Sequence, residues 1–461
     1  MQKSITAIWC GLSVQVPGVR DCDFCIQLRK LYLKIRAVDA SQVREDMFET
    51  YSVRVPEAKY DCSKDYQKLP AKADAWQAQL KKAYGRSAKC LCPGTGQKTL
   101  NIRHLKVLNR YVLARSANSG HEHASDCRFF SEAEYRTGLG SYVEGVVQEG
   151  DENDVSVRLS QAIQLRKKND GADPKVDLPF DSRKPGRTQR AMSLLGLLHL
   201  LWTRSGLNTW FPKMEGKRDD SILQWILEQT AENIKTHRMT LEKVLLSPAK
   251  NGSRNRDVLD RAKKHQYRLI AVGVLQPFSG DVDDTLDQMQ SLPLMSNSGM
   301  PTMYLNGKPW ADAQHSFARE IKAWKAGAKT IAIAFLSLRD NSRYYDVLEV
   351  ALMRVSDMLI PLDSGLEGKV EAMLREQKRK FSKPLRFDTD DKTIPDFWLN
   401  DLSDEFPMEV FGMNTTEYLL RRNHKITHYQ SAYGQRLGWW YWDAYKDSSV
   451  TSIPPLPSAT R

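Results

Sequence analysis

Hydrophobic residues in the middle of the chain recur with the spacing of buried helices. A leucine-rich pattern beginning at Met192 covers most of a helical surface, through Leu194, Leu195, Leu197, Leu198, Leu200 and Leu201. A second helical pattern spans residues 219–236, and residues 213–218 form a basic connection between the two. Residues 188–250 therefore fit either a helix-turn-helix DNA reader or a plain helical packing module.

The next region mixes strand and helix patterns. Residues 268–275 and 329–336 are short runs rich in β-branched and apolar side chains, which predict buried strands. Residues 313–326 have helical spacing, and residues 345–360 fit another apolar helix or a helix that runs into a strand. We expect an α/β or α+β module over residues 251–350.

The C-terminal pattern predicts a helix, three strands and a second helix. Residues 362–380 have helical spacing, and residues 381–387 are typical of a strand. Two apolar runs follow, 395–399 and 407–413, and a short polar turn separates them. The last helical pattern covers residues 415–433.

Each of the two apolar runs carries a carboxylate. Asp396 lies at the start of the first run, and Glu409 lies in the middle of the second. A hairpin would place both side chains side by side at the edge of a sheet. Two carboxylates held in this way bind Mg²⁺ or Mn²⁺, which activates water for attack on a phosphate.

This order of elements and spacing of acids resembles the PD-(D/E)XK nuclease superfamily over residues 360–442. The resemblance implies that Glu367, from the first helix, joins Asp396 and Glu409, and that the Val410 carbonyl is a further metal ligand. Ser364 and Glu367 also have the spacing of a capping box, which requires glutamate for helix initiation alone.

The chain departs from the superfamily at one position. Phe411 stands where members carry a lysine, two residues after the second acid. In some members the following helix supplies the lysine, and here Glu417, Arg421 and Lys425 would share one helix face. Lys425 is the preferred substitute, and an exposed salt-bridged stripe is the alternative. Without a substitute, the domain would be a degenerate nuclease fold that only binds DNA.

Composition adds charge to this picture. The 461 residues include 68 Lys and Arg against 56 Asp and Glu, a net charge of +12, which favours an anionic partner such as DNA or RNA. A hydrophobic content of 41% is enough for packed cores, so a disordered protein is excluded. No apolar run of about 18 residues occurs, and the first 17 residues do not fit a signal peptide, so we expect a cytoplasmic protein.

Four residues have the spacing of a structural zinc site. Cys90 and Cys92 form a Cys-x-Cys pair, and His123 and Cys127 form a His-x3-Cys pair. Three thiolates and one imidazole complete a four-coordinate Zn²⁺ site. His121 is an alternative imidazole ligand, and buried free cysteines near surface histidines are the alternative reading.

The remaining cysteines leave a second metal site open. Seven cysteines, an odd number, and no export signal argue against a disulfide framework. A second zinc site could use the four other cysteines, Cys10, Cys22, Cys25 and Cys62.

A second resemblance covers much of the chain. It rests on the zinc-site residues, on the segments 196–199, 201–202 and 216–218, and on Trp210, residues 351–353 and residues 360–361. These residues resemble an uncharacterised bacterial family, of unknown function, that is carried on plasmids and integrative elements. The resemblance implies a mobile-element or anti-phage defence setting and carries no activity.

The sequence thus predicts a multidomain α/β (α+β) protein. Its expected parts are an N-terminal region (1–85), a zinc-binding module (86–138), a linker (139–187), a helical module (188–250), an α/β module (251–350), a restriction-endonuclease-like domain (351–445) and a flexible tail (446–461).

We expect a Mg²⁺-dependent endonuclease or DNA-processing protein that hydrolyses phosphodiester bonds. The alternative is a catalytically inactive, nucleic-acid-binding scaffold subunit. No Walker-type phosphate-binding motif occurs, so an ATP-driven translocase would be a separate partner. A homo-oligomer is also compatible with the sequence.

Overall fold

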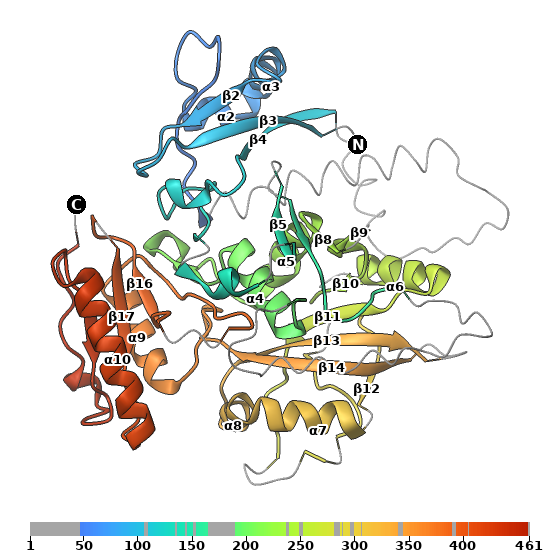
Figure 1. The fold of residues 1–461 in the computed structure, drawn as a ribbon. Helices are drawn as coiled ribbons and strands as arrows, with labels where there is room; N and C mark the ends of the chain where they lie inside the picture. Colours follow the sequence, from blue (N-terminus) through green and yellow to red (C-terminus); the bar gives the residue numbers. More distant parts are fainter. Residues whose placement is uncertain are drawn as a thin grey trace, which may run out of the picture. The chain divides into compact units, whose positions relative to one another are not determined.

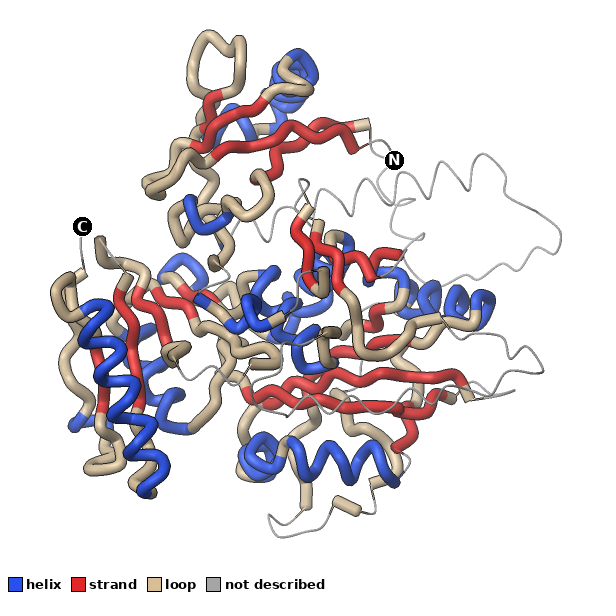
Figure 2. Tube along the Cα trace, viewed as in Figure 1, coloured by secondary structure: helices blue, strands red, loops and turns tan. Residues whose placement is uncertain are grey.

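The structure, a computed structural model, describes most of residues 47–459. The gaps in this description are 106–108, 134–135, 143–144, 151–153, 165–189, 237–238, 249–251, 281–285, 288, 296–298, 306, 340–343, 390–392 and 404. The described residues belong to one compact unit. Cys10, Cys22 and Cys25 lie outside the described residues, and Cys62 is buried and unbridged. The described residues form a mixed α/β fold with several sheets (Figures 1 and 2).

The first sheet is antiparallel and has the order β1-β2-β3-β4. Its strands are β1 (Val53–Arg54), β2 (Ser87–Cys90), β3 (Thr99–Leu105) and β4 (Arg110–Arg115). Between β1 and β2 the chain forms α2 (Lys64–Lys68) and α3 (Ala73–Lys82), and α3 buries Trp76 and Leu80. The boundary expected at residue 85 is corrected, because Val53 pairs with Cys90 and joins both sides of it in one sheet.

A second sheet has the order β5-β6-β8-β9. Its strands are β5 (Val147–Glu149), β6 (Val155–Val157), β8 (Ile234–Thr236) and β9 (Met239–Thr240). The first two strands lie in the expected linker, 139–187, and β6 pairs in parallel with β8. This part of the linker is therefore structured, because Val155 and Val157 bury their side chains. Residues 165–187 lie outside the described residues.

The leucine-rich helix is α4 (Leu194–Ser205), and ten of its twelve residues are buried. Ser193 caps its start by accepting a hydrogen bond from the Gly196 amide, and Gly206 ends it with a φ of 74°. The helix contacts α5 (Leu223–Glu232). Strand β7 (Thr209–Trp210) and two 3-10 turns lie between α4 and α5, whereas a helix-turn-helix has a turn of about three to four residues. The geometry matches a packing module.

The central sheet has the order β10-β11-β13-β14-β12. Its strands are β10 (Leu245–Leu246), β11 (Leu269–Val274), β12 (Met303–Leu305), β13 (Thr330–Leu338) and β14 (Tyr345–Arg354). Helix α6 (Ser253–His265) contacts β10, while α7 (Gly307–Ser316) and α8 (Ala318–Lys325) lie along one face and α4 along the other (Figure 1).

Two predictions for this sheet had different outcomes. The strands expected at 268–275 and 329–336 are confirmed as β11 and β13. The helix expected within 345–360 is wrong, because residues 345–354 form β14. Strand β14 pairs with β13 along its length and with β12 on its other side. Tertiary pairing therefore overrides the helical spacing of its apolar residues.

The C-terminal sheet has the order β18-β17-β16-β15-β7. Its strands, apart from β7, are β15 (Phe381–Ser382), β16 (Phe397–Leu399), β17 (Phe406–Val410) and β18 (Trp440–Trp442). Helix α9 (Gly365–Glu376) precedes β15, and α10 (Thr416–Tyr433) connects β17 to β18. Strands β15, β16 and β17 are antiparallel neighbours, and β18 is parallel to β17.

Among the described helices, none combines the length and the apolar character needed to cross a membrane.

Candidate functional site

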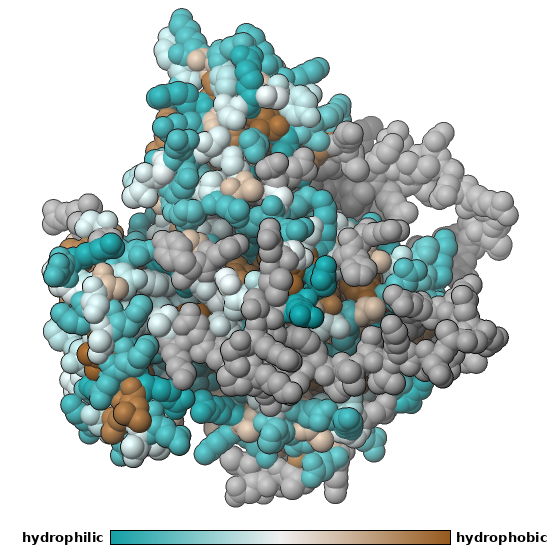
Figure 3. All heavy atoms as spheres, in the orientation of Figure 1, coloured by the Kyte–Doolittle hydropathy of each residue, from teal (hydrophilic) through white to brown (hydrophobic). Residues whose placement is uncertain are grey.

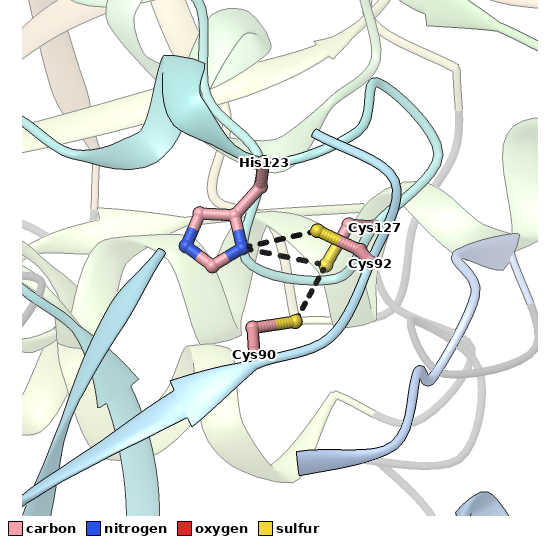
Figure 4. A group of neighbouring side chains, drawn as sticks. All are labelled: Cys90, Cys92, His123 and Cys127. Carbon is pink, nitrogen blue, oxygen red and sulfur yellow. Dashed lines mark hydrogen bonds between the residues drawn. The ribbon is translucent and has the colours of Figure 1, made fainter. Parts of the chain in front are cut away.

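The predicted cysteine and histidine ligands converge in the structure (Figure 4). The Cys90 and Cys127 sulfurs lie 3.8 Å apart, and His123 Nδ1 lies 3.6 Å from Cys92 Sγ and 3.7 Å from Cys127 Sγ. All four side chains are buried. Cys90 is the last residue of β2, and His123 and Cys127 lie in the segment after β4. His121 is not part of the cluster.

This arrangement fits a tetrahedral metal ion. Zinc–sulfur bonds of about 2.3 Å place tetrahedral sulfurs about 3.8 Å apart. The 3.8 Å between Cys90 and Cys127 matches that separation. The Ala124 amide donates a hydrogen bond to Cys92 Sγ. Hydrogen bonds from the Cys127 and Cys90 thiols lower the pKa of Cys92, whereas the hydrogen bond with Cys90 raises the pKa of Cys127, so the cluster favours one thiolate, at Cys92.

A tight turn supports the cysteine and histidine cluster. A Cβ on Gly94 would lie 2.1 Å from the Glu122 carbonyl oxygen, so glycine allows the turn after Cys92 to pack against the segment that carries His123. Lys98 closes the same turn, because its amide donates to the Glu122 carboxylate and its ammonium donates to the Gly94 carbonyl.

A second cluster lies where α9 begins and β15 and β16 meet. The carboxylates of Asp363, Glu367 and Asp396 offer oxygens that all lie within 4.8 Å of one another. The Lys383 ammonium lies among them, 2.9 Å from Asp363, 2.8 Å from Glu367 and 3.9 Å from Asp396. Arg386 lies, like Lys383, in the loop after β15. Its guanidinium is 3.9 Å from Asp363 and 3.8 Å from Asp396.

Glu367 lies both in the first turn of α9 and in the acidic cluster. Its amide donates to the hydroxyl of Ser364, the N-cap of α9, and its carboxylate accepts from the Asp363 amide. The same carboxylate pairs with Lys383. Helix capping and membership of the acidic cluster are therefore compatible, because the start of α9 points at the sheet edge.

Burial shapes the electrostatics of this cluster. Burial raises the pKa of Glu367 to about 8, despite the nearby Lys383 ammonium. Burial alone would lower the pKa of Lys383, but the attraction of Asp363 and Glu367 outweighs it and raises the pKa, so Lys383 stays charged. The protein thus holds an ammonium between oxygen atoms that a hard divalent cation would also use.

Glu409 lies beside this cluster and has partners on α10. Its carboxylate accepts from the Lys425 ammonium at 2.6 Å and from the Tyr429 hydroxyl at 2.8 Å. Both donors also contact backbone carbonyls, Lys425 that of Ile394 and Tyr429 that of Thr393. Burial and the Asp396 charge raise the pKa of Glu409 to about 7. Glu409 does not belong to the three-carboxylate group.

The hairpin still brings the two predicted acids together. Strand pairing sets Phe397 opposite Met408, so Asp396 and Glu409 occupy the next pair of opposed positions. The Asp396 carboxylate accepts a hydrogen bond from the Val410 amide at 2.8 Å. Val410 therefore contacts Asp396 through its N–H group and not through its carbonyl.

Sequence reasoning missed several residues at this site. Asp363, Lys383 and Arg386 line the cluster, and Tyr429 orients Glu409. Lys383 and Arg386 interrupt an apolar run that was interpreted only as a strand, although β15 covers just its first two residues. The available signal in the sequence is a lysine within an apolar run; in the structure, the Lys383 side chain is 1% exposed.

The described part of the segment 126–138, which includes Cys127 of the cysteine and histidine cluster, contacts the hairpin that carries Lys383 and Asp396. Asp126 pairs with Lys380 at 2.9 Å, and Glu132 accepts from the Ser382 hydroxyl at 2.5 Å. Trp398 donates its indole N–H to the Arg136 carbonyl at 3.4 Å. Residues 126–138 therefore pack against β15 and β16.

Two further contacts hold the loop of Lys383 and Arg386. A Cβ on Gly138 would lie 1.9 Å from the Arg386 carbonyl oxygen, so only glycine fits there. The backbone carbonyl of Asn208 accepts a hydrogen bond from the Lys383 amide, and the Asn208 side-chain amide donates one to the Lys383 carbonyl. Gly138 and Asn208, which are far from residue 383 in the sequence, thus fix the backbone around Lys383.

A family model described as "Protein of unknown function (DUF1173)" matches residues 64–444. This range includes both clusters. No curated protein and no solved structure matches the chain.

Proposed function

We propose that this chain, which belongs to the DUF1173 family, is a metal-dependent DNA endonuclease or DNA-processing protein that hydrolyses phosphodiester bonds. The observation that carries the proposal is the convergence of Asp363, Glu367 and Asp396 with Lys383 at one edge of the C-terminal sheet. Carboxylate oxygens suit Mg²⁺ or Mn²⁺, and lysine suits a phosphate.

The order of elements supports the same proposal. Helix α9, the three antiparallel strands β15, β16 and β17, and helix α10 follow the order that the nuclease resemblance implies. The acids lie at the start of α9 and on the central hairpin, where that resemblance places them. The restriction-endonuclease-like assignment of residues 351–445 remains part of the proposal.

Each residue of the site has a role in this proposal. Asp396, with Asp363, Glu367 and the neighbouring Glu409, would hold the cation, which would supply a water of lowered pKa and neutralise phosphate charge. Lys383 and Arg386 stabilise negative charge on the phosphate oxygens. Lys425, the predicted substitute for the missing lysine, orients Glu409, while Lys383 lies closer to the three carboxylates.

The cysteine and histidine cluster would hold a structural Zn²⁺. Its four protein ligands leave no open coordination position, and its burial excludes water, which fits a structural rather than a catalytic ion. In this role the metal fixes the segment 126–138 against β15 and β16.

The test is cleavage of supercoiled, linear and single-stranded DNA with Mg²⁺ or Mn²⁺. Asp396→Asn and Glu409→Gln keep a hydrogen-bond acceptor at each position, so we expect folded proteins that bind DNA and do not cut it. Asp357→Asn, at an exposed position outside the site, is the matched control and should cut normally. Normal cleavage by both site variants would show that the site is assigned wrongly.

A catalytically inactive scaffold is the second candidate function. Phe411 occupies the usual lysine position, and the Lys383 ammonium pairs with the buried carboxylates of Glu367 and Asp396. Binding of DNA without cleavage in any of these conditions would favour this alternative. The mobile-element or defence setting, a partner translocase and a homo-oligomer remain predictions.

A further inference from the structure

Strand β18 divides its aromatic side chains between the two faces of the C-terminal sheet. Trp440 and Trp442 are buried, whereas Tyr441 between them is 40% exposed. Side chains alternate along a strand, so Trp439, one residue before β18, shares the face of Tyr441. The register sets Tyr441 beside Glu409 on β17. The exposed aromatic residues therefore lie on the sheet face that carries Glu409.

Ring contacts join these residues into one continuous group. Trp439 and Tyr441 are stacked, with ring centroids 4.8 Å apart and an interplanar angle of 25°. Trp439 also contacts the Tyr429 ring at 5.3 Å, and its indole N–H donates to the Gln430 side chain at 3.3 Å. Tyr429 itself donates to the Glu409 carboxylate. The stacked pair is thus held in place and adjoins a carboxylate of the candidate site.

Two cations lie against the same aromatic group. The centre of the Arg422 guanidinium is 5.9 Å from the Tyr441 ring centroid and 5.9 Å from that of Tyr445. The Lys446 ammonium lies 5.6 Å from the Tyr445 centroid, and its side chain is 63% exposed. Both cations pair with the Asp443 carboxylate, so these three charged groups together keep one positive charge. Direct contacts therefore join the aromatic rings and the cations into one surface.

A single strand of nucleic acid carries both kinds of group that this surface suits. Its unpaired bases have flat π faces, which stack on aromatic side chains, and each base is followed by a phosphate that a cation attracts. Bases inside a duplex are paired and stacked on one another, so their faces are covered. On the side of α10 that Figure 3 shows, the described side chains are mainly hydrophilic around a small hydrophobic patch, which favours a polyanion over a partner with a broad apolar face.

We propose that Trp439 and Tyr441 stack on unpaired bases of a DNA strand, while the Lys446 ammonium contacts the phosphates of that strand. The substrate of the candidate site is then DNA with a single-stranded region, and the stacked pair holds this region beside Glu409. The choice of DNA and the role at the site rest on the function proposed above.

The test measures binding of a labelled oligothymidine of about 20 nucleotides by fluorescence anisotropy. No divalent cation is added, so the strand stays intact. Tyr441→Leu removes the ring but keeps an apolar side chain, and it should weaken binding at least about fivefold. Tyr441→Phe keeps the ring and should bind like the wild type. The matched control is Tyr60→Leu, because Tyr60 is 74% exposed and has the Lys59 ammonium 5.4 Å from its ring centroid.

Two further measurements separate stacking from a purely structural role. A 2-aminopurine base placed in the strand loses fluorescence when it stacks on an aromatic ring, and Tyr441→Leu should reduce this quenching at saturating protein. Lys446→Gln, at an exposed position, should lower the salt slope of binding by about 0.7. It also covers the case in which Tyr441→Leu misfolds, which circular dichroism would detect.

Several outcomes would overturn the proposal. They are unchanged affinity in Tyr441→Leu, an equal loss in Tyr60→Leu, and equal or tighter binding of a DNA duplex or of oligouridine than of oligothymidine. Loss of self-association in Tyr441→Leu, measured by sedimentation, with unchanged DNA affinity would instead identify a contact between copies of this chain. The proposed function fails separately, because a wild-type chain that binds the strand through Tyr441 but never cuts DNA would leave the surface assignment intact.

Discussion

Replacing Lys383 by Met tests whether its ammonium holds the acidic cluster together. The change keeps a long apolar stem but removes the charge that lies 2.8–3.9 Å from three carboxylates. Breaking one partner of a buried ion pair costs about 3–5 kcal/mol. Asp363 is 57% exposed and Arg386 stays nearby, so we expect about 3 kcal/mol.

Amide hydrogen exchange of β15 and β16 measures this cost locally. A loss of about 3 kcal/mol corresponds to exchange that is roughly two orders of magnitude faster. The Lys380→Met variant is the control, because its ion pair with Asp126 is partly exposed and contributes about 1 kcal/mol or less. Exchange in that variant should change less than tenfold.

Added Mg²⁺ tests whether a divalent cation can replace the Lys383 ammonium. If the ammonium and a divalent cation use the same oxygens, Mg²⁺ should restore protection of β15 and β16 in the Lys383→Met variant. The same protection in wild-type and variant proteins without Mg²⁺ would refute the view that Lys383 balances the carboxylates. Faster exchange that Mg²⁺ leaves unchanged would separate the lysine from the metal site.

Three further predictions concern the elements around the site. Cys127→Ser should lose close to one zinc per chain, measured by elemental analysis, and should speed exchange of β15 and β16; retained zinc would contradict the ligand set. Burial lowers the pKa of His199 from 6.5 to about 4, and its Nδ1 accepts from the Phe387 amide. The folded state therefore favours the neutral ring. The free energy of unfolding is at its full value above pH 6.5 and falls by up to about 3 kcal/mol as the pH drops towards 4. Urea titrations should find a smaller fall in the His199→Gln variant. Gly138→Ala should destabilise the fold by about 2 kcal/mol or more in the same titrations, whereas Gly140→Ala, with open space around it, should not.

Local periodicity predicted the elements that can be identified within a short window. The leucine pattern of α4, the β-branched runs of β11 and β13, and the helical spacing of α9 and α10 each appear in the structure. Strand β14 does not follow its local pattern, because its conformation comes from pairing with β13 and β12.

The two clusters differ in how much the sequence could predict. Cys90, Cys92, His123 and Cys127 lie in two close pairs, and few residue types bind zinc, so their spacing already indicated one site. The acidic cluster draws on the start of α9, the loop after β15 and the start of β16. Aspartate and lysine are common throughout the chain, unlike cysteine and histidine. The spacing of Asp363 and Lys383 in the sequence does not indicate that their side chains form a contact.

The sequence by itself therefore indicated the residues of the cysteine and histidine cluster, with His121 left open beside His123, the carboxylates Asp396 and Glu409, and most of the helices and strands that carry them. Only the tertiary structure decided that Lys425 pairs with Glu409 while Lys383 enters the group of three carboxylates. The physical reason is that local backbone preferences act over a few residues, whereas these charges meet through strand pairing and helix packing between distant segments.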